Sequence, residues 1–182
     1  MKSFFVLLTL IVFNVASNGA VEEGRELIGK PASEWTVSHW LNSQPLSFRD
    51  LRGKVLLIRW WTGPECPYCK ASAPTLNGLY EKYHVQGFEV IGFYHHKSTA
   101  PLDPNEVEKL AKEFGFHFPI AIDDDWETLQ RWWIKGHDRT FTSVSFLINK
   151  KGIIRYIHPG GEYSAKDIAQ LQRIVERLLK QS

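Results

Sequence analysis

Cysteine is nearly absent from this chain: its 182 residues contain only two, Cys66 and Cys69. A structural zinc site usually takes four ligands, and there is no second CxxC pair and no HxxxH spacing to complete one. Basic runs are also missing, and the formal net charge is only +2, so nothing predicts a nucleic-acid partner. Internal repeats, low-complexity tracts and long linkers are absent too, which favours a single domain with a substantial core.

The N-terminal apolar stretch is too short for a membrane span, which takes about 20 apolar residues. Lys2 precedes this stretch at residues 4–15, and small residues follow at positions 16, 17, 19 and 20. The pattern predicts a signal peptide over residues 1–17, ending between 17 and 20, and one domain over 18–182. The alternative is an uncleaved N-terminal anchor. Export would place the protein in the periplasm, an oxidising compartment where a disulfide persists.

Pro67 and Tyr68 separate the two cysteines, which follow an apolar run at residues 55–61. A pair at this spacing can form a small disulfide, and a helix that begins there stabilises the first sulfur as a thiolate. Because a thiolate attacks disulfides, the layout predicts thiol–disulfide exchange, with Cys66 as nucleophile and Cys69 as resolving thiol. Two alternatives stay open. One is a structural disulfide in a non-catalytic partner-binding domain, and the other is metal binding.

Alternating apolar and amphipathic segments predict an α/β sandwich with a central mixed sheet. The run at residues 55–61 is apolar on both faces, as in a buried central strand. Asp103 is expected to cap a helix, Gly115 to end it and Pro74 to kink another. The other expected strands cover residues 35–40, 46–48, 88–94, 118–122, 145–149 and 153–157, and the helices cover 70–83, 104–114, 126–133 and the segment from Ser164.

A set of short segments carries a family pattern: residues 28–32, 51–55, 60–62, 66–70 with Pro74, and 146–152. They resemble the thioredoxin fold, and more closely the exported TlpA/ResA-like thiol–disulfide oxidoreductases of the redoxin group. The resemblance covers nearly all of the chain after the signal segment. It implies a thioredoxin-like three-layer sandwich with an N-terminal strand extension and an inserted helix and strand.

Three positions depart from the pattern of that family. The family places a cis-proline against its disulfide, where this chain has Ser143, after Thr142. ResA-like members carry an acidic residue three positions after the second cysteine, where this chain has Ser72. The pair Pro67-Tyr68 is more similar to glutaredoxin. The resemblance implies that backbone at Thr142-Ser143 orients the partner chain, and that loss of the proline changes substrate choice or lets a metal approach.

The residues just before Cys66 bear on its chemistry. Peroxiredoxins, which belong to the same group, need a threonine three positions before the reactive cysteine. Gly63 stands there and Thr62 lies one position earlier, which argues against peroxidase chemistry. Glu65 would raise the pKa of a neighbouring thiol through its charge, unless it is simply an exposed loop acid.

His95-His96 ends the expected strand at residues 88–94. In this fold the carboxyl ends of parallel strands lie on the side where ligands gather. An imidazole there would assist proton transfer, or join Cys66 and Cys69 in holding copper, as in the Sco-type relatives of the fold. The simpler interpretation is two surface histidines in a loop.

The run at 55–61 ends with one charged residue and two tryptophans. Successive strand side chains point to opposite faces, so Trp60 and Trp61 should pack on different sides. Arg59 should find an acid or reach an edge, because burying an unpaired charge is costly.

The expected protein is therefore an exported, monomeric thiol–disulfide oxidoreductase. Its partners would be protein thiols and disulfides and a membrane redox partner, and the family suggests apocytochrome c as one substrate. No cofactor is expected beyond the disulfide itself, and copper enters only in the metal-binding alternative.

Overall fold

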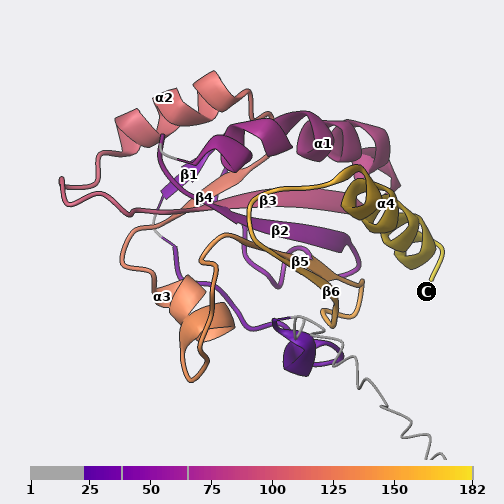
Figure 1. The fold of residues 1–182 in the computed structure, drawn as a ribbon. Helices are drawn as coiled ribbons and strands as arrows, with labels where there is room; N and C mark the ends of the chain where they lie inside the picture. The colour runs from indigo at the N-terminus through magenta and orange to yellow at the C-terminus, as the bar shows by residue number, and fades with distance from the viewer. Residues whose placement is uncertain (1–22, 38, 65, 182) are drawn as a thin grey trace, which may run out of the picture.

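The computed structural model describes residues 23–37, 39–64 and 66–181. The predicted signal peptide and Glu65 lie outside these ranges. Six strands form one mixed sheet with helical segments on both faces (Figure 1). The expected α/β three-layer, thioredoxin-like architecture is therefore confirmed. Within the described ranges, no helix has the length and apolar content needed to cross a bilayer.

The sheet has the strand order β1-β4-β3-β2-β5-β6. Neighbouring strands β2, β3 and β4 run parallel, while β1 pairs with β4 and β5 pairs with β2 in antiparallel fashion. β5 and β6 form the expected antiparallel hairpin. All seven residues of β2 are buried, as expected of the central strand. The bounds are β1 (His39–Leu41), β2 (Val55–Trp61), β3 (Phe88–His95), β4 (Ile120–Asp123), β5 (Val144–Ile148) and β6 (Ile154–Pro159).

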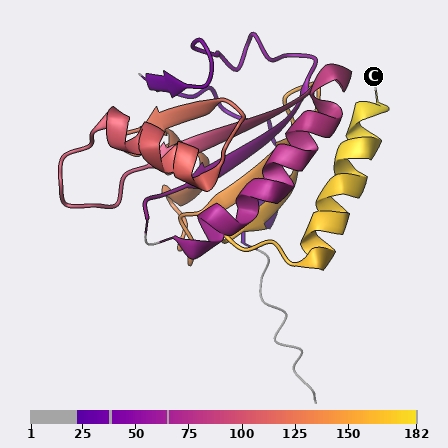
Figure 2. The ribbon, with the colours of Figure 1, turned by 90° about the horizontal axis from the view of Figure 1, so that it is seen from above.

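Three long helices cover one face of the sheet, α1 (Pro67–Tyr83), α2 (Pro104–Phe114) and α4 (Ala165–Leu179) (Figure 2). The other face is covered by residues 27–37 together with α3 (Glu127–Leu129) and the π-helix η3 (Gln130–Ile134) (Figure 1). Two 3-10 turns, η1 (Arg25–Leu27) and η2 (His84–Gln86), complete the elements. The inserted helix and strand are α2 and β4.

The helix ends follow local chemistry. The side chain of Asp103 accepts a hydrogen bond from the backbone N–H of Asn105 at the start of α2. Gly115 ends that helix in the left-handed region, at φ 74°, which favours glycine. Ser164 and Asp167 form a capping box at the start of α4. The expected boundaries of these two helices are thus confirmed.

One local expectation is wrong, and another is only partly met. Residues 46–48 form turns and irregular backbone instead of a strand, so β1 alone makes the N-terminal extension. The expected helix at 126–133 is a three-residue α-helix followed by a π-helix. Pro74 lies inside α1 and leaves one carbonyl of the preceding turn without its helical donor, and the kink expected there stays a prediction.

Trp60 and Trp61 lie in two separate cores. Trp61 packs with α1, α2 and α4, whereas Trp60 packs on the opposite face with Trp132 and Phe146. Neither tryptophan has exposed area. The strand alternation expected from the sequence is confirmed, and β2 contributes side chains to the core on each face of the sheet.

Candidate functional site

Cys66 and Cys69 form a disulfide where β2 passes into α1. Their Cα atoms are 5.4 Å apart. Cys66 is the N-cap residue of α1, and Pro67 lies in the first turn, where a helix needs no N–H donor. The helix therefore begins three residues earlier than residue 70, and its unpaired N–H groups lie next to the disulfide.

The two sulfur-bearing residues differ in their access to solvent. Cys66 is partly exposed and lines a surface cavity. Cys69 has no exposed area and packs in the core beneath α1. A reactant that approaches from solvent therefore meets Cys66 first.

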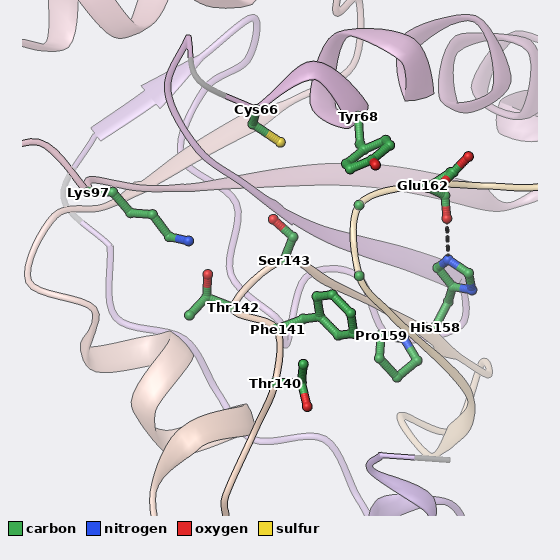
Figure 3. Close-up of a pocket in the computed structure, with 12 residues that line it drawn as sticks. Cys66, Tyr68, Lys97, Thr140, Phe141, Thr142, Ser143, His158, Pro159 and Glu162 are labelled. Carbon is green, nitrogen blue, oxygen red and sulfur yellow. Dashed lines mark hydrogen bonds between the residues drawn. The ribbon is translucent and has the colours of Figure 1, made fainter. Parts of the chain in front are cut away.

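The cavity beside Cys66, which we call the exchange groove, has a volume of about 450 Å³ (Figure 3). The start of α1, the segment before β5 and the turn after β6 form its walls, and Lys97 reaches in from the loop after β3. Tyr68 and Phe141 expose 48% and 47% of their surface beside it. Its lining residues are Cys66, Tyr68, Lys97, residues 140–143 and residues 158–162.

Thr142 and Ser143 lie in the groove beside Cys66, and both come from the segment before β5. The carbonyl of Ser143 accepts a hydrogen bond from the N–H of Gly160 at 2.8 Å. The hydroxyl of Thr142 lies 3.1 Å from Nε2 of His95. No cis peptide bond occurs in the described residues, so this segment turns towards the disulfide with a trans bond before Ser143. The segment is thus held from both β6 and β3.

His95 is fully buried at the end of β3, so the surface-loop interpretation is wrong for this residue. Its ring packs edge-on against Trp126, with centroids 5.0 Å apart. Burial, with a smaller contribution from Lys97, lowers the pKa of His95 to about 3. The imidazole is therefore neutral at neutral pH and cannot serve there as a proton donor of ordinary strength. It orients Thr142 instead of lining the groove.

His96 points to the other side of the Cys66 loop. Its Nδ1 lies 3.0 Å from the hydroxyl of Tyr94, and its Nε2 lies 2.7 Å from the carbonyl oxygen of Ala100. It lines a second cavity of about 260 Å³ together with residues 62–64. Both ring nitrogens are engaged, so this histidine fixes its own loop.

The four residues of the copper alternative are not brought together. Among the described residues, no group of three or more His, Cys, Asp and Glu side chains is placed to hold a metal ion. Cys66 and Cys69 are joined to each other. The geometry therefore gives the copper hypothesis no support.

Several residues of the site do not stand out in the sequence. Phe141, His158 and the Gly160–Gly161 turn line the groove because β6 returns beside β5. Arg59 does stand out in the sequence, because a charged side chain in an apolar strand needs hydrogen-bond or ion-pair partners. The expected acid is not found among the described residues: the guanidinium donates to the carbonyls of Gly160 and Gly161, in the turn that follows the edge strand β6.

Known proteins similar to this chain share its fold and its cysteine chemistry. Residues 28–157 match the model of the AhpC/TSA family. The thiol–disulfide oxidoreductase ResA of Bacillus thuringiensis subsp. konkukian is 30% identical over 158 residues, which cover 82% of each chain. The crystal structure of a thiol–disulfide isomerase from Corynebacterium glutamicum superposes with a TM-score of 0.68 and 27% identity, covering 84% of this chain and 97% of that one.

One relative is much longer than this chain. The protein DipZ of Mycobacterium bovis is 31% identical over 135 residues, which are 72% of this chain and 19% of DipZ. The chain thus spans about a fifth of DipZ. From these matches and the disulfide at the start of α1, the chain belongs to the AhpC/TSA family and is a ResA-like redoxin, a thiol–disulfide oxidoreductase of the thioredoxin fold.

Proposed function

We propose that the chain exchanges its Cys66–Cys69 disulfide with the thiols of protein substrates. The observation that carries the proposal is the asymmetry of the pair: Cys66 opens into the exchange groove and Cys69 is buried behind it. The start of α1 adds the positive end of a 17-residue helix beside Cys66. This is the environment in which a thiol ionises readily.

In the reducing direction, the Cys66 thiolate attacks one sulfur of a substrate disulfide. The substrate S–S bond breaks, a mixed disulfide forms, and the released substrate thiolate takes up a proton. The Cys69 thiolate then attacks Sγ of Cys66 and releases the second substrate thiol. The protein loses two electrons and two protons, and the substrate gains them. In the oxidising direction, a substrate thiolate attacks Cys66 and every step runs in reverse.

The groove gives the substrate chain a surface beside Cys66. Residues Thr142 and Ser143 supply backbone at its floor, and Tyr68 and Phe141 supply exposed rings at its sides. Backbone groups bind any extended peptide, while aromatic rings add contact area at little entropic cost. The proposed substrates are therefore protein segments that present a cysteine in extended conformation.

Export, and with it the partners, is part of the proposal. The apolar segment at residues 4–15 and the small residues after it support secretion to the periplasm, with N-terminal anchoring as the alternative if the signal stays in place. A periplasmic protein of this kind exchanges electrons with a membrane redox partner, and apocytochrome c is one substrate to test. We propose that it acts as a monomer.

Trapping experiments test the exchange reaction. Cys69→Ala should accumulate a mixed disulfide with a disulfide-bonded protein, because the Cys66 thiolate attacks one sulfur of that disulfide and no second thiol resolves the product. Cys66→Ala should neither form this adduct nor reduce a disulfide-bonded reporter protein. If Cys66→Ala exchanges as fast as the parent chain, the proposal is wrong. Asn77→Ala, a change further along α1 and outside the groove, is the control for general damage to the helix.

A further inference from the structure

An arginine is buried in the middle of the sheet, directly behind the exchange groove. Arg59 has no exposed area, although it is the charged residue of a seven-residue strand. Its partners in the sheet register are Gly92 on β3 and Ser145 on β5. Both neighbours are small, which leaves room for the guanidinium on the face that carries α1 and α4.

The guanidinium is held by backbone carbonyls. Nη1 donates to the carbonyl of Gly160 at 2.9 Å, and Nη2 donates to the carbonyl of Gly161 at 3.0 Å. Among the residues that the structure describes, Arg59 forms no ion pair with a carboxylate, and its Nε has no partner. The ring of Tyr163 lies 5.5 Å from the guanidinium carbon. A full positive charge is therefore buried with only dipoles around it, an arrangement that costs free energy of folding.

Only one layer of backbone separates this charge from the cysteine motif. Gly160 and Gly161 line the groove together with Cys66. A Cβ atom on Gly161 would lie 2.9 Å from Cβ of Tyr68 and 3.5 Å from Nη2 of Arg59. Figure 3 shows Tyr68 facing this turn. The turn is thus in contact with the guanidinium on one side and with the CPYC motif on the other.

The other titratable groups around the site leave its potential positive. His95 on β3 and His158 on β6 are desolvated, and burial is the main reason that the pKa of each is lowered. Arg59 lowers both further through its charge. Lys97 adds a second cation at the groove, and Glu162 contributes an exposed carboxylate at its rim. Both histidines are therefore neutral at neutral pH and add no charge of their own beside the buried guanidinium.

We propose that Arg59 is a positioning residue of the disulfide-exchange site: its buried charge stabilises the reduced, thiolate form of the Cys66–Cys69 pair, and its two hydrogen bonds hold the Gly160–Gly161 wall. A cation near a thiolate favours the reduced pair, and a redox couple whose reduced form is stabilised is the stronger oxidant. Arg59 therefore moves the couple towards the oxidising end. The inference deepens the proposed function, on which it rests for its consequence in turnover.

An equilibrium measurement on the full chain tests the charge. The protein disulfide plus two glutathione thiols gives the dithiol plus one glutathione disulfide, and alkylation reports the fraction reduced. Arg59→Met should lower this equilibrium constant about tenfold, or about 30 mV for a two-electron couple. It should also raise the thiol pKa of Cys66, read from the pH dependence of alkylation. Arg59→Lys keeps the charge and should stay within threefold of the parent chain.

A matched control and a fallback variant keep the test decisive. Lys54→Met also removes a cation, at the opposite end of β2, and should leave the equilibrium constant unchanged. If Arg59→Met fails to fold, Arg59→Gln is measured, because its amide still donates to one carbonyl. An unchanged constant and thiol pKa in the neutral variant would overturn the role of the charge. Equal shifts in the Lys and Met variants would overturn it too, since only the wall geometry would then matter.

The test of Arg59 can succeed or fail independently of the test of the proposed function. The glutathione equilibrium reads the couple itself and needs no protein substrate. A parent chain that exchanges with no protein substrate, but whose Arg59→Met variant shows the shift, would refute the function and keep the role of Arg59.

Discussion

Replacing Gly161 with alanine probes how closely the groove wall packs against the cysteine motif. The new Cβ would lie 2.9 Å from Cβ of Tyr68, a separation that real Cβ atoms essentially never show. Cβ of Tyr68 is fixed to the backbone of α1 and cannot rotate away. The turn after β6 or the first turn of α1 must therefore move to make room.

The size of the effect follows from overpacking. Adding a methyl group to a closely packed site costs about 1–3 kcal/mol. In a protein of this size each kcal/mol lowers Tm by roughly 2–4 °C, so we expect Gly161→Ala to lower Tm by about 2–12 °C. The displaced wall should also slow disulfide exchange, because Gly161 lines the groove beside Cys66.

The assay is thermal unfolding of the oxidised protein followed by far-ultraviolet circular dichroism, paired with the rate of reporter reduction. Gly78→Ala is the matched control, since a Cβ on Gly78 meets nothing within 4 Å and lies inside α1. Alanine there should stabilise the helix by about 0.5–1 kcal/mol, the opposite sign. Unchanged Tm and exchange rate in Gly161→Ala would refute the packing argument.

Three further changes have defined outcomes, each read by chemical denaturation. The pKa of His95 is about 3 in the fold against an ordinary 6.5, so its neutral form contributes stability that is complete above pH 6.5 and is lost as pH falls towards 3. His95→Gln should flatten this acid dependence. If the free energy of unfolding of the variant falls with pH as steeply as that of the parent chain, His95 is not its source. Ser164→Ala removes the hydroxyl that caps α4 and should cost about 1 kcal/mol; no loss would mean that Asp167 caps alone. Lys54→Met leaves the buried carboxylate of Glu89 without its 3.1 Å partner and should cost about 1–3 kcal/mol, which a neutral result would disprove.

The sequence predicts the sheet and its long helices well because the spacing of apolar residues along these segments matches the side chains that are buried. β2 and β3 are buried throughout and mostly apolar, and they end at the site, while α2 and α4 carry cap residues at the expected positions. The disulfide could be placed at the start of a helix because the apolar strand stops just before it. The chemistry is predictable here because it depends on neighbours in the chain.

The failed expectations concern residues whose burial does not come from strand pairing. Phe48 is buried, which gives residues 46–48 a strand-like pattern. The carbonyl of Leu46, however, accepts from the indole N–H of Trp35 at 2.8 Å instead of from a neighbouring strand. An alternation of apolar and polar residues therefore indicates which side chains are buried in the core, and it does not show which backbone groups form strand hydrogen bonds.

The site also depends on contacts that the sequence does not encode locally. The carbonyl that accepts from Nη1 of Arg59 lies 101 residues further along the chain, in a turn with no charged motif. The burial of His95 depends on Trp126 and Thr142, which reach it from other segments. Such partners follow from strand order, which a single sequence does not supply.

The adjacent tryptophans of β2 have a consequence for how the protein unfolds. One peptide unit joins Trp60, which supports one core, to Trp61, which supports the other. Loss of either core would leave a large ring of this strand exposed and remove the platform of the other. The two halves should therefore melt as one cooperative unit, with no stable intermediate that keeps only one layer of helices.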